Sequence, residues 1–215
     1  ESKPHSKIDW TVGMSYNRVR TKQAFFTDFT DILTRGYISL TDYKMNQQTF
    51  SQFANVSYNL PYNVTIDGGI VHESDDRQIF NLTTAHLGIN NIPYEPQGAL
   101  TNQFGGHVGV KWQVTKNVLL YYKIARGFKP GGFTANNIVS QAQLVPFKPE
   151  WILSHEIGVK ADIIPNVLRI NAAAFYYDYH GQQILGSMLI PSYGVLGAIV
   201  NVPKSRIYGF EGTVQ

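Results

Sequence analysis

Apolar and polar side chains alternate with a period of two in eight separate segments of this chain. The first segment places Ile8, Trp10 and Met14 on one face and Asp9 and Ser15 on the other. Successive side chains of a β-strand point to opposite faces of a sheet, so this period predicts strands with one apolar face each. The apolar faces comprise 36 positions, and none of them is Asp, Glu, Lys or Arg. The apolar faces of the eight predicted strands lie within residues 8–16, 54–60, 64–70, 104–114, 118–124, 157–163, 168–176 and 208–214.

The opposite faces of these strands do carry charge. Their charged residues are Asp67, Lys111, Lys123, Glu156, Lys160, Asp162, Arg169 and Glu211. Lipid offers no hydrogen bonds, so a sheet in a bilayer must pair every backbone group within a closed barrel. Such a barrel is apolar outside and polar inside. The sequence therefore predicts an all-β, antiparallel transmembrane barrel segment whose charged face lines a lumen.

Short and long connections alternate along the chain, which is typical of outer-membrane barrels with short periplasmic turns and long outer loops. The predicted tight turns are Pro61-Tyr62-Asn63, Thr115-Lys116-Asn117 and Pro165-Asn166, and the predicted long loops are 21–47, 75–102, 128–150 and 184–198.

Composition narrows the class further. Only 15% of the residues are charged, against roughly 25% in a typical soluble domain. The mean hydropathy of −0.17 and the lack of a long uninterrupted apolar run disfavour a helical membrane protein. The chain has no cysteine, which excludes disulfides and cysteine metal sites. Its 18 basic residues form no run, so we expect no nucleic-acid partner.

A soluble sandwich or a lipocalin-like barrel would also alternate. Predicted strands of about 9–13 residues exceed the 5–6 of soluble sheets and match the 9–11 that a bilayer needs. Aromatic residues also lie toward the strand ends on the apolar face, as a membrane-interface girdle requires. The candidate interface aromatics are Trp10, Tyr58, Trp112 and Tyr122.

Four motifs occur in order from residue 104 onward. The first is the segment 119–133, a tyrosine-rich strand followed by Arg-Gly-Phe-Lys-Pro-Gly-Gly-Phe. The others are Phe-Lys-Pro-Glu with Glu-Ile-Gly-Val-Lys within 147–160, Arg-Ile-Asn-Ala-Ala-Ala-Phe-Tyr-Tyr-Asp-Tyr at 169–179, and Ser-Arg-Ile-Tyr-Gly-Phe-Glu at 205–211. Together they resemble the second half of the barrel of TonB-dependent receptors.

The resemblance implies a barrel of 22 strands, plugged by an N-terminal domain, in the outer membrane of a Gram-negative bacterium. It also implies active uptake of a scarce nutrient, such as a siderophore–iron complex, energised by TonB. We expect residues 1–215 to be about eight strands of that barrel domain, with the plug domain and the final strands absent. Expected partners are outer-membrane lipid and lipopolysaccharide, the TonB complex through the absent plug region, and a small-molecule ligand.

The resemblance places ligand contacts in outer loops. The candidate ligand-binding residues are Arg126, Phe128, Lys129, Phe133, Tyr94 and Tyr193. The candidates for facing the lumen or the plug are Lys123, Glu156, Lys160, Arg169 and Glu211.

No motif predicts an enzyme, a catalytic residue, a metal site or a cofactor. Gly127, Gly131 and Gly132 lack the Gly-Lys-Ser/Thr of a phosphate loop, and we interpret them as supplying unusual backbone angles. The acid and base in Asp75-Asp76-Arg77 are assigned to a loop without a partner. Two alternatives stay open: a small complete eight-stranded barrel with a structural or adhesive role, and an outer-membrane hydrolase.

Overall fold

The computed structural model describes residues 7–28, 38–86, 89–135, 138, 141–165, 167–190 and 194–215. These residues form nine β-strands and two single-turn 3-10 helices. The elements are β1 (Ile8–Asp28), β2 (Ile38–Leu60), η1 (Pro61–Asn63), β3 (Val64–His86), β4 (Ile89–Pro93), β5 (Gln97–Thr115), β6 (Val118–Lys129), η2 (Gln141–Leu144), β7 (Glu150–Ile164), β8 (Leu168–Ile190) and β9 (Gly194–Val214).

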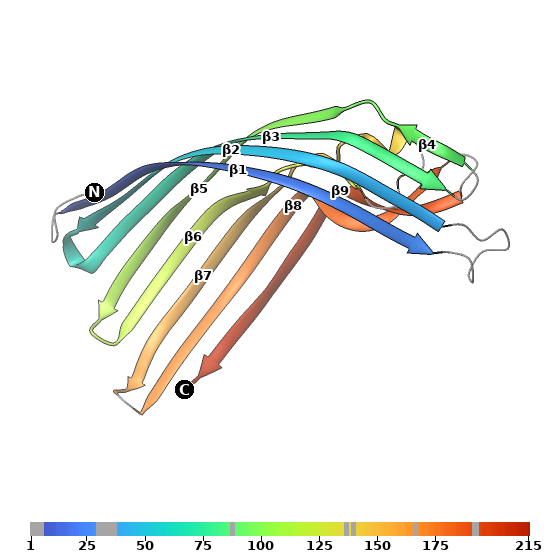
Figure 1. Ribbon diagram of the computed structural model, residues 1–215. Helices are drawn as coiled ribbons and strands as arrows, with labels where there is room; N and C mark the ends of the chain where they lie inside the picture. The colour runs from blue at the N-terminus through green and yellow to red at the C-terminus, as the bar shows by residue number, and fades with distance from the viewer. Residues whose placement is uncertain are drawn as a thin grey trace.

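The strands form one curved antiparallel sheet in the order β1-β2-β3-β5-β6-β7-β8-β9 (Figure 1). Each strand of this path follows the last in sequence, apart from the short β4, which pairs only with β3. The eight predicted strands and their antiparallel meander are therefore confirmed. The short strand β4 was not predicted, and it lies inside the expected loop 75–102.

Three tight connections lie at one end of the sheet, as predicted. η1 joins β2 to β3, and its Tyr62 and Asn63 take positive φ angles of 65° and 58°. Two residues, Lys116 and Asn117, join β5 to β6. The third turn joins β7 to β8 after Ile164.

The strands are longer than predicted, so three of the four expected loops are largely wrong. β1, β2, β3, β8 and β9 each contain 21 to 23 residues. Most of 21–47, 75–102 and 184–198 is paired strand, and only 128–150 remains mostly irregular. Beyond the apolar layer, polar and apolar residues occur on both faces and the regular alternation ends. The backbone ladder continues there because its hydrogen bonds do not depend on side-chain polarity.

The register aligns the apolar positions of all eight strands on one face. One row across the sheet runs Trp10, Val56, Gly68, Val108, Ile124, His155, Tyr176 and Tyr208. The apolar side chains of this face are uncovered: Val108 is 55% exposed and Ile157 is 59% exposed. We call this face outward and the opposite, charge-bearing face inward.

The buried core is small and lies on the inward face, at the end remote from the tight turns. It is formed where the connection 130–149, here called the inward loop, folds back across the sheet. Its residues are Tyr43, Ile79, Leu82, Tyr94, Ala135, Ile138 and Leu144. Within the described part of the chain, no helix has the length and apolarity needed to span a membrane.

Candidate ligand-binding mouth and lumen face

A polar hollow of about 810 Å³ lies on the inward face near the tight turns. It brings together four of the five candidate lumen-facing residues: Glu156, Lys160, Arg169 and Glu211. These residues come from three neighbouring strands, and the antiparallel register places them side by side. Lys123, the fifth, lies directly across from Glu156 in the ladder between β6 and β7.

Tyr121 organises the centre of this hollow. Its ring lies over Gly158, where an added Cβ would come within 2.5 Å of the ring. The phenol donates a hydrogen bond of 2.7 Å to Glu156 Oε1, and Lys160 Nζ lies 5.9 Å from the ring centroid. The Glu156 carboxylate thus bonds to Tyr121. Nearby, Arg169 Nε donates to Asp162 Oδ1 at 2.5 Å across β7 and β8.

A second inward cluster lies nearer the mouth, the end remote from the tight turns. Asp75 is 1% exposed, and its carboxylate accepts hydrogen bonds from Gln47 Nε2 at 2.7 Å and Thr49 Oγ1 at 2.8 Å. Arg77 Nε donates to the other oxygen at 2.5 Å. The interpretation of Asp75-Asp76-Arg77 as a loop without partners was therefore wrong. These residues lie on β3. Their hydrogen-bond partners on β2 are distant in sequence and come close only because the two strands pair.

The Arg77 guanidinium reaches the inward loop at Gly132, where an added Cβ would lie 2.9 Å from Arg77 Nη1. The loop closes on itself at this point. Gly132 N donates to Phe147 O at 3.2 Å, and Phe147 N donates to Gly132 O at 2.8 Å. A Cβ on Gly131 would lie 2.3 Å from Phe147 O.

The two glycines of the Gly-Gly-Phe motif therefore serve a different purpose from the one predicted. The glycines with positive φ in the described chain are Gly181 and Gly194, and neither belongs to this motif. Gly131 and Gly132 instead allow two backbone segments to approach more closely than a side chain would permit. The paired glycines were visible in the sequence. The reason for them, the close approach of Phe147, depends on how the loop folds back and could not be read from the sequence.

Two inward side chains on β8 and β9 hold the ends of the loop. Gln183 Nε2 donates to Pro130 O at 2.9 Å and to Lys148 O at 3.1 Å. Asn201 Oδ1 accepts from Lys148 N at 2.8 Å, while its Nδ2 donates to Lys148 O at 2.9 Å and Gly181 O at 2.7 Å. Sequence reasoning did not select Gln183 or Asn201 for this role, because each lies some 50 residues beyond its loop partner.

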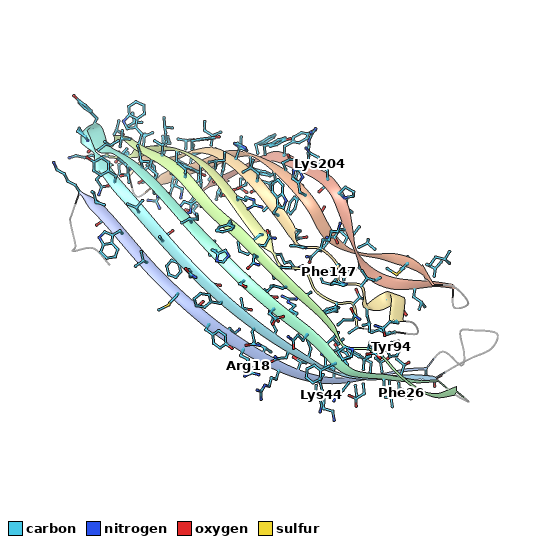
Figure 2. All side chains as sticks on the ribbon, turned by 90° about the horizontal axis from the view of Figure 1, so that it is seen from above. Arg18, Phe26, Lys44, Tyr94, Phe147 and Lys204 are labelled. Atoms are coloured by element: carbon cyan, nitrogen blue, oxygen red, sulfur yellow. The ribbon has the colours of Figure 1, made fainter. Side chains whose placement is uncertain are left out.

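Apolar packing completes the attachment of the loop. Ile138 and Leu144 are 0% and 1% exposed and pack in the core cluster with Tyr43 of β2. Burial raises the pKa of Tyr43, whose phenol donates a hydrogen bond to Gln23 of β1. In Figure 2, Tyr94 and Phe147 lie on the side of the sheet where the loop returns. The inward loop is thus a packed element that covers the inward face at the mouth.

The candidate ligand-binding residues do not form one group. Arg126, Phe128 and Lys129 lie on β6 and not in a loop, because the ladder with β7 continues to the pair Lys129–Glu150. Arg126 lies 5.0 Å from the Trp151 ring centroid and donates to Phe104 O. The Phe128 ring lies against Gly105, and Lys129 is exposed.

The remaining three candidates differ in exposure. Phe133 is in the inward loop and packs against the core cluster. Tyr94 follows β4 and is 8% exposed, with its hydroxyl 3.0 Å from Thr84 Oγ1. Tyr193 lies outside the described residues. Burial makes Tyr94 a packing residue in this state.

The four candidate interface aromatics all lie on the outward face. Trp10, Tyr58, Trp112 and Tyr122 are each between 42% and 47% exposed. Tyr122 also has its hydroxyl 2.8 Å from His155 Nδ1. Half-exposed rings with a polar tip are what the boundary between hydrocarbon and water favours.

The chain was compared with known proteins. The family model described as "TonB dependent receptor-like, beta-barrel" matches residues 3–215. Curated relatives include the pesticin receptors of Yersinia enterocolitica and Yersinia pestis, which are 27% and 26% identical over 180 residues. The match covers 82% of this chain and 25% of either receptor, so the chain spans about a quarter of their length.

Solved structures share the fold. The ferric yersiniabactin uptake receptor FyuA from Yersinia pestis superposes with a TM-score of 0.79 at 18% identity, covering 99% of this chain and 30% of that one. The siderophore receptor PiuA from Acinetobacter baumannii gives a TM-score of 0.68 at 16% identity, covering 96% of this chain and 32% of that one.

Proposed function

Because the chain belongs to the TonB-dependent receptor-like β-barrel family, we propose that it forms part of the barrel of an outer-membrane transporter that takes up a scarce nutrient. The observation that carries this proposal is the family match over residues 3–215. In the proposed orientation, the tight turns face the periplasm and the inward loop lies at the extracellular mouth. The outward face contacts outer-membrane lipid and lipopolysaccharide.

The division between the two faces supports transport through the lumen. The apolar and aromatic side chains of the outward face can lie directly against lipid, so no other protein surface has to cover them. The inward face carries charged groups, such as Glu156 and Lys160, that a lipid would not tolerate and that water or a plug domain would satisfy. We assign contact with the plug to this hollow and, through the plug, coupling to the TonB complex.

We propose an iron–siderophore complex as the nutrient. The curated relatives are named pesticin receptors, and FyuA is described as a ferric yersiniabactin uptake receptor. Lys129 at the end of β6 and Phe133 in the inward loop bring a cation and an aromatic ring close to the mouth. A chelate with an anionic and an aromatic part would contact both groups.

Uptake by whole cells tests the function. Cells that carry the intact protein are starved of iron and supplied with ⁵⁵Fe bound to one of a panel of siderophores. We expect uptake of at least one complex to depend on the protein, on a functional TonB system and on the membrane potential. A strain carrying the deletion and a plasmid copy is the control.

Two results would contradict the proposal. Uptake that continues after loss of TonB would contradict a mechanism energised by TonB. The deletion strain could also grow normally and take up every iron source and every other nutrient supplied. That result would favour the structural or adhesive alternative.

A further inference from the structure

The outer ends of β8 and β9 continue past the rest of the sheet as a two-stranded ribbon. Among the described residues, β7 pairs with β8 only as far as His180, so residues 181–190 of β8 pair with residues 194–203 of β9 and with no other strand (Figure 2). We call this segment the outer ribbon. The outward ion pair of Asp178 and Lys204 lies between it and the apolar layer. In the proposed orientation, the outer ribbon therefore lies on the extracellular side of the lipid.

The outer ribbon carries no charge. Residues 181–203 include no Asp, Glu, Lys or Arg, although 15% of the whole chain is charged. Lipid does not account for this composition, because the charged pair separates the ribbon from the membrane layer. Exposed apolar surface outside a membrane is typical of a binding site.

One face of the outer ribbon is more open than the other. Leu185 and Leu189 of β8 are 78% and 74% exposed, and Val195 of β9 is 66% exposed. On the other face, Met188 is half-buried and Ala198 is 6% exposed. The most exposed apolar side chains of the ribbon thus share one face.

The open face is directed toward the mouth. Gln183 and Asn201 bond to the backbone of the inward loop, and alternate residues of a strand share a face. Leu185 and Leu189 therefore lie on the same side of the sheet as Gln183. The inward loop also contacts the ribbon through Thr134 Oγ1, which accepts a hydrogen bond of 3.0 Å from Ile199 N. A ligand that enters from outside meets this face next to the inward loop.

The register gives the open face its shape. Two apolar pairs lie across the ribbon, Leu185 with Ile199 and Leu189 with Val195. Between them Ser187 pairs with Gly197, where an added Cβ would meet nothing within 4 Å. The two apolar pairs thus rise on either side of a low floor of small residues. We call this surface the apolar saddle.

The size of the apolar saddle indicates the kind of molecule that it binds. Its two apolar pairs are four residues apart along the strands, and the strands lie about 4.8 Å apart, so the surface measures on the order of 100 Å². A stable protein partner buries about 800 Å² on each side, whereas a single aromatic group buries about 150–250 Å². The apolar saddle therefore suits one planar apolar group and is too small for a protein.

Two cations lie near the foot of the outer ribbon. Lys148 is exposed, and Asn201 of the ribbon binds its backbone. Lys129 is also exposed, and its ladder partner Glu150 accepts a hydrogen bond of 2.5 Å from Gln183 N. Within the described part of the chain, neither lysine has a carboxylate oxygen within 4.0 Å. An anionic group bound near the apolar saddle would find both ammonium groups available.

We propose that the apolar saddle binds an aryl ring of the iron chelate, while Lys129 and Lys148 attract its anionic part. The inference rests on the proposed function and narrows its substrate class to chelates that carry an aryl group. Leu185, Leu189 and Val195 then determine specificity. A ring-free aliphatic chelate would leave their side chains in water and would gain nothing from them.

Cysteine labelling of whole cells tests where the ring binds. Residues 1–215 contain no cysteine, so L189C in a full-length protein without other cysteines reports on one position. L100C is the matched control, because Leu100 is 65% exposed on the outward face of β5. We expect an impermeant maleimide to label both variants, and saturating ferric yersiniabactin or ferric enterobactin to slow labelling of L189C alone, by at least about tenfold. A cysteine at 189 that is not labelled without ligand would show that the saddle is covered and would overturn the site.

Chelate binding by the purified full-length protein tests ring recognition. Ferric yersiniabactin and ferric enterobactin carry aryl rings, whereas ferrioxamine B and ferric aerobactin carry none. We expect the better aryl chelate to bind at least about tenfold more tightly than either ring-free chelate. L185S/L189S is expected to lose at least about tenfold in affinity for it, since much of the apolar contact is removed, and L100S should bind like the wild type.

A third variant separates shape from apolarity. G197L adds apolar surface but fills the floor of the saddle, so it is expected to weaken aryl binding by about tenfold or more. Tighter binding by G197L would contradict a ring lying on that floor. Folding of each variant is verified by its heat-dependent mobility on a gel, and L189S replaces the double variant if the latter misfolds.

The remaining outcomes separate this inference from the proposed function. Equal affinity of L185S/L189S and the wild type would overturn the site, and tightest binding by a ring-free chelate, or no binding by either aryl chelate, would overturn the substrate class. TonB-dependent uptake of ring-free chelates alone would refute the apolar saddle and leave the proposed function standing. Binding of an aryl chelate with protection of L189C, but without uptake of any nutrient, would do the reverse.

Discussion

The inward loop is expected to detach from the sheet when Leu144 is shortened to alanine. Leu144 belongs to the inward loop. It is 1% exposed and packs in the core cluster between the loop and the sheet. A buried Leu→Ala change costs about 2–5 kcal/mol, including the cavity that it leaves. The strands form a separate ladder, so this loss lowers the local free energy of loop opening and leaves the sheet folded.

Hydrogen–deuterium exchange of the intact protein measures that opening. The Lys148 amide is protected by its bond to Asn201 of β9, and the Gly132 and Phe147 amides are protected by the two bonds that close the loop on itself. A loss of about 2 kcal/mol corresponds to roughly 30-fold faster exchange. We expect at least that acceleration in peptides spanning 130–149 and no change in peptides of β8.

Val145→Ala is the matched control, since the neighbouring Val145 is 70% exposed and its truncation leaves the packing intact. Unchanged exchange in Leu144→Ala, or equal acceleration in both variants, would refute the conclusion that buried contacts hold the loop. Faster exchange throughout β8 would instead show that loop and sheet unfold as one unit.

Two further predictions concern the two faces of the sheet. Gly158→Ala places a Cβ against Tyr121 and is expected to destabilise the protein by about 1–3 kcal/mol in urea unfolding from lipid vesicles. Gly197→Ala, where nothing lies within 4 Å of the added Cβ, should unfold like the wild type, and equal effects would disprove the packing role of Tyr121. Val108→Lys on the outward face is expected to cost about 2–4 kcal/mol, because lysine would lie in lipid. Thr213→Lys on the inward face should cost much less, and a reversed order would mean that the faces are assigned the wrong way round.

The sequence was sufficient to predict the eight main strands and the composition of their two faces. Alternation is a local property, and a run such as Ile8 to Tyr16 records in each residue whether it faces lipid. The tight turns were predictable for the same reason, because their residues determine their own backbone angles. The charged hollow followed from these assignments, since the register of an antiparallel meander brings inward positions of neighbouring strands together.

Tertiary structure alone decided how far the strands continue and where the long connection goes. Beyond Tyr16 the side chains no longer alternate, and pairing there depends on a partner strand whose position no local pattern records. The return of the inward loop depends on contacts between distant residues, such as Lys148 with Asn201 and Arg77 with Gly132. Local sequence determined which way each side chain points, whereas long-range contacts determined which surfaces are covered, because burial requires a partner that the strand itself does not supply.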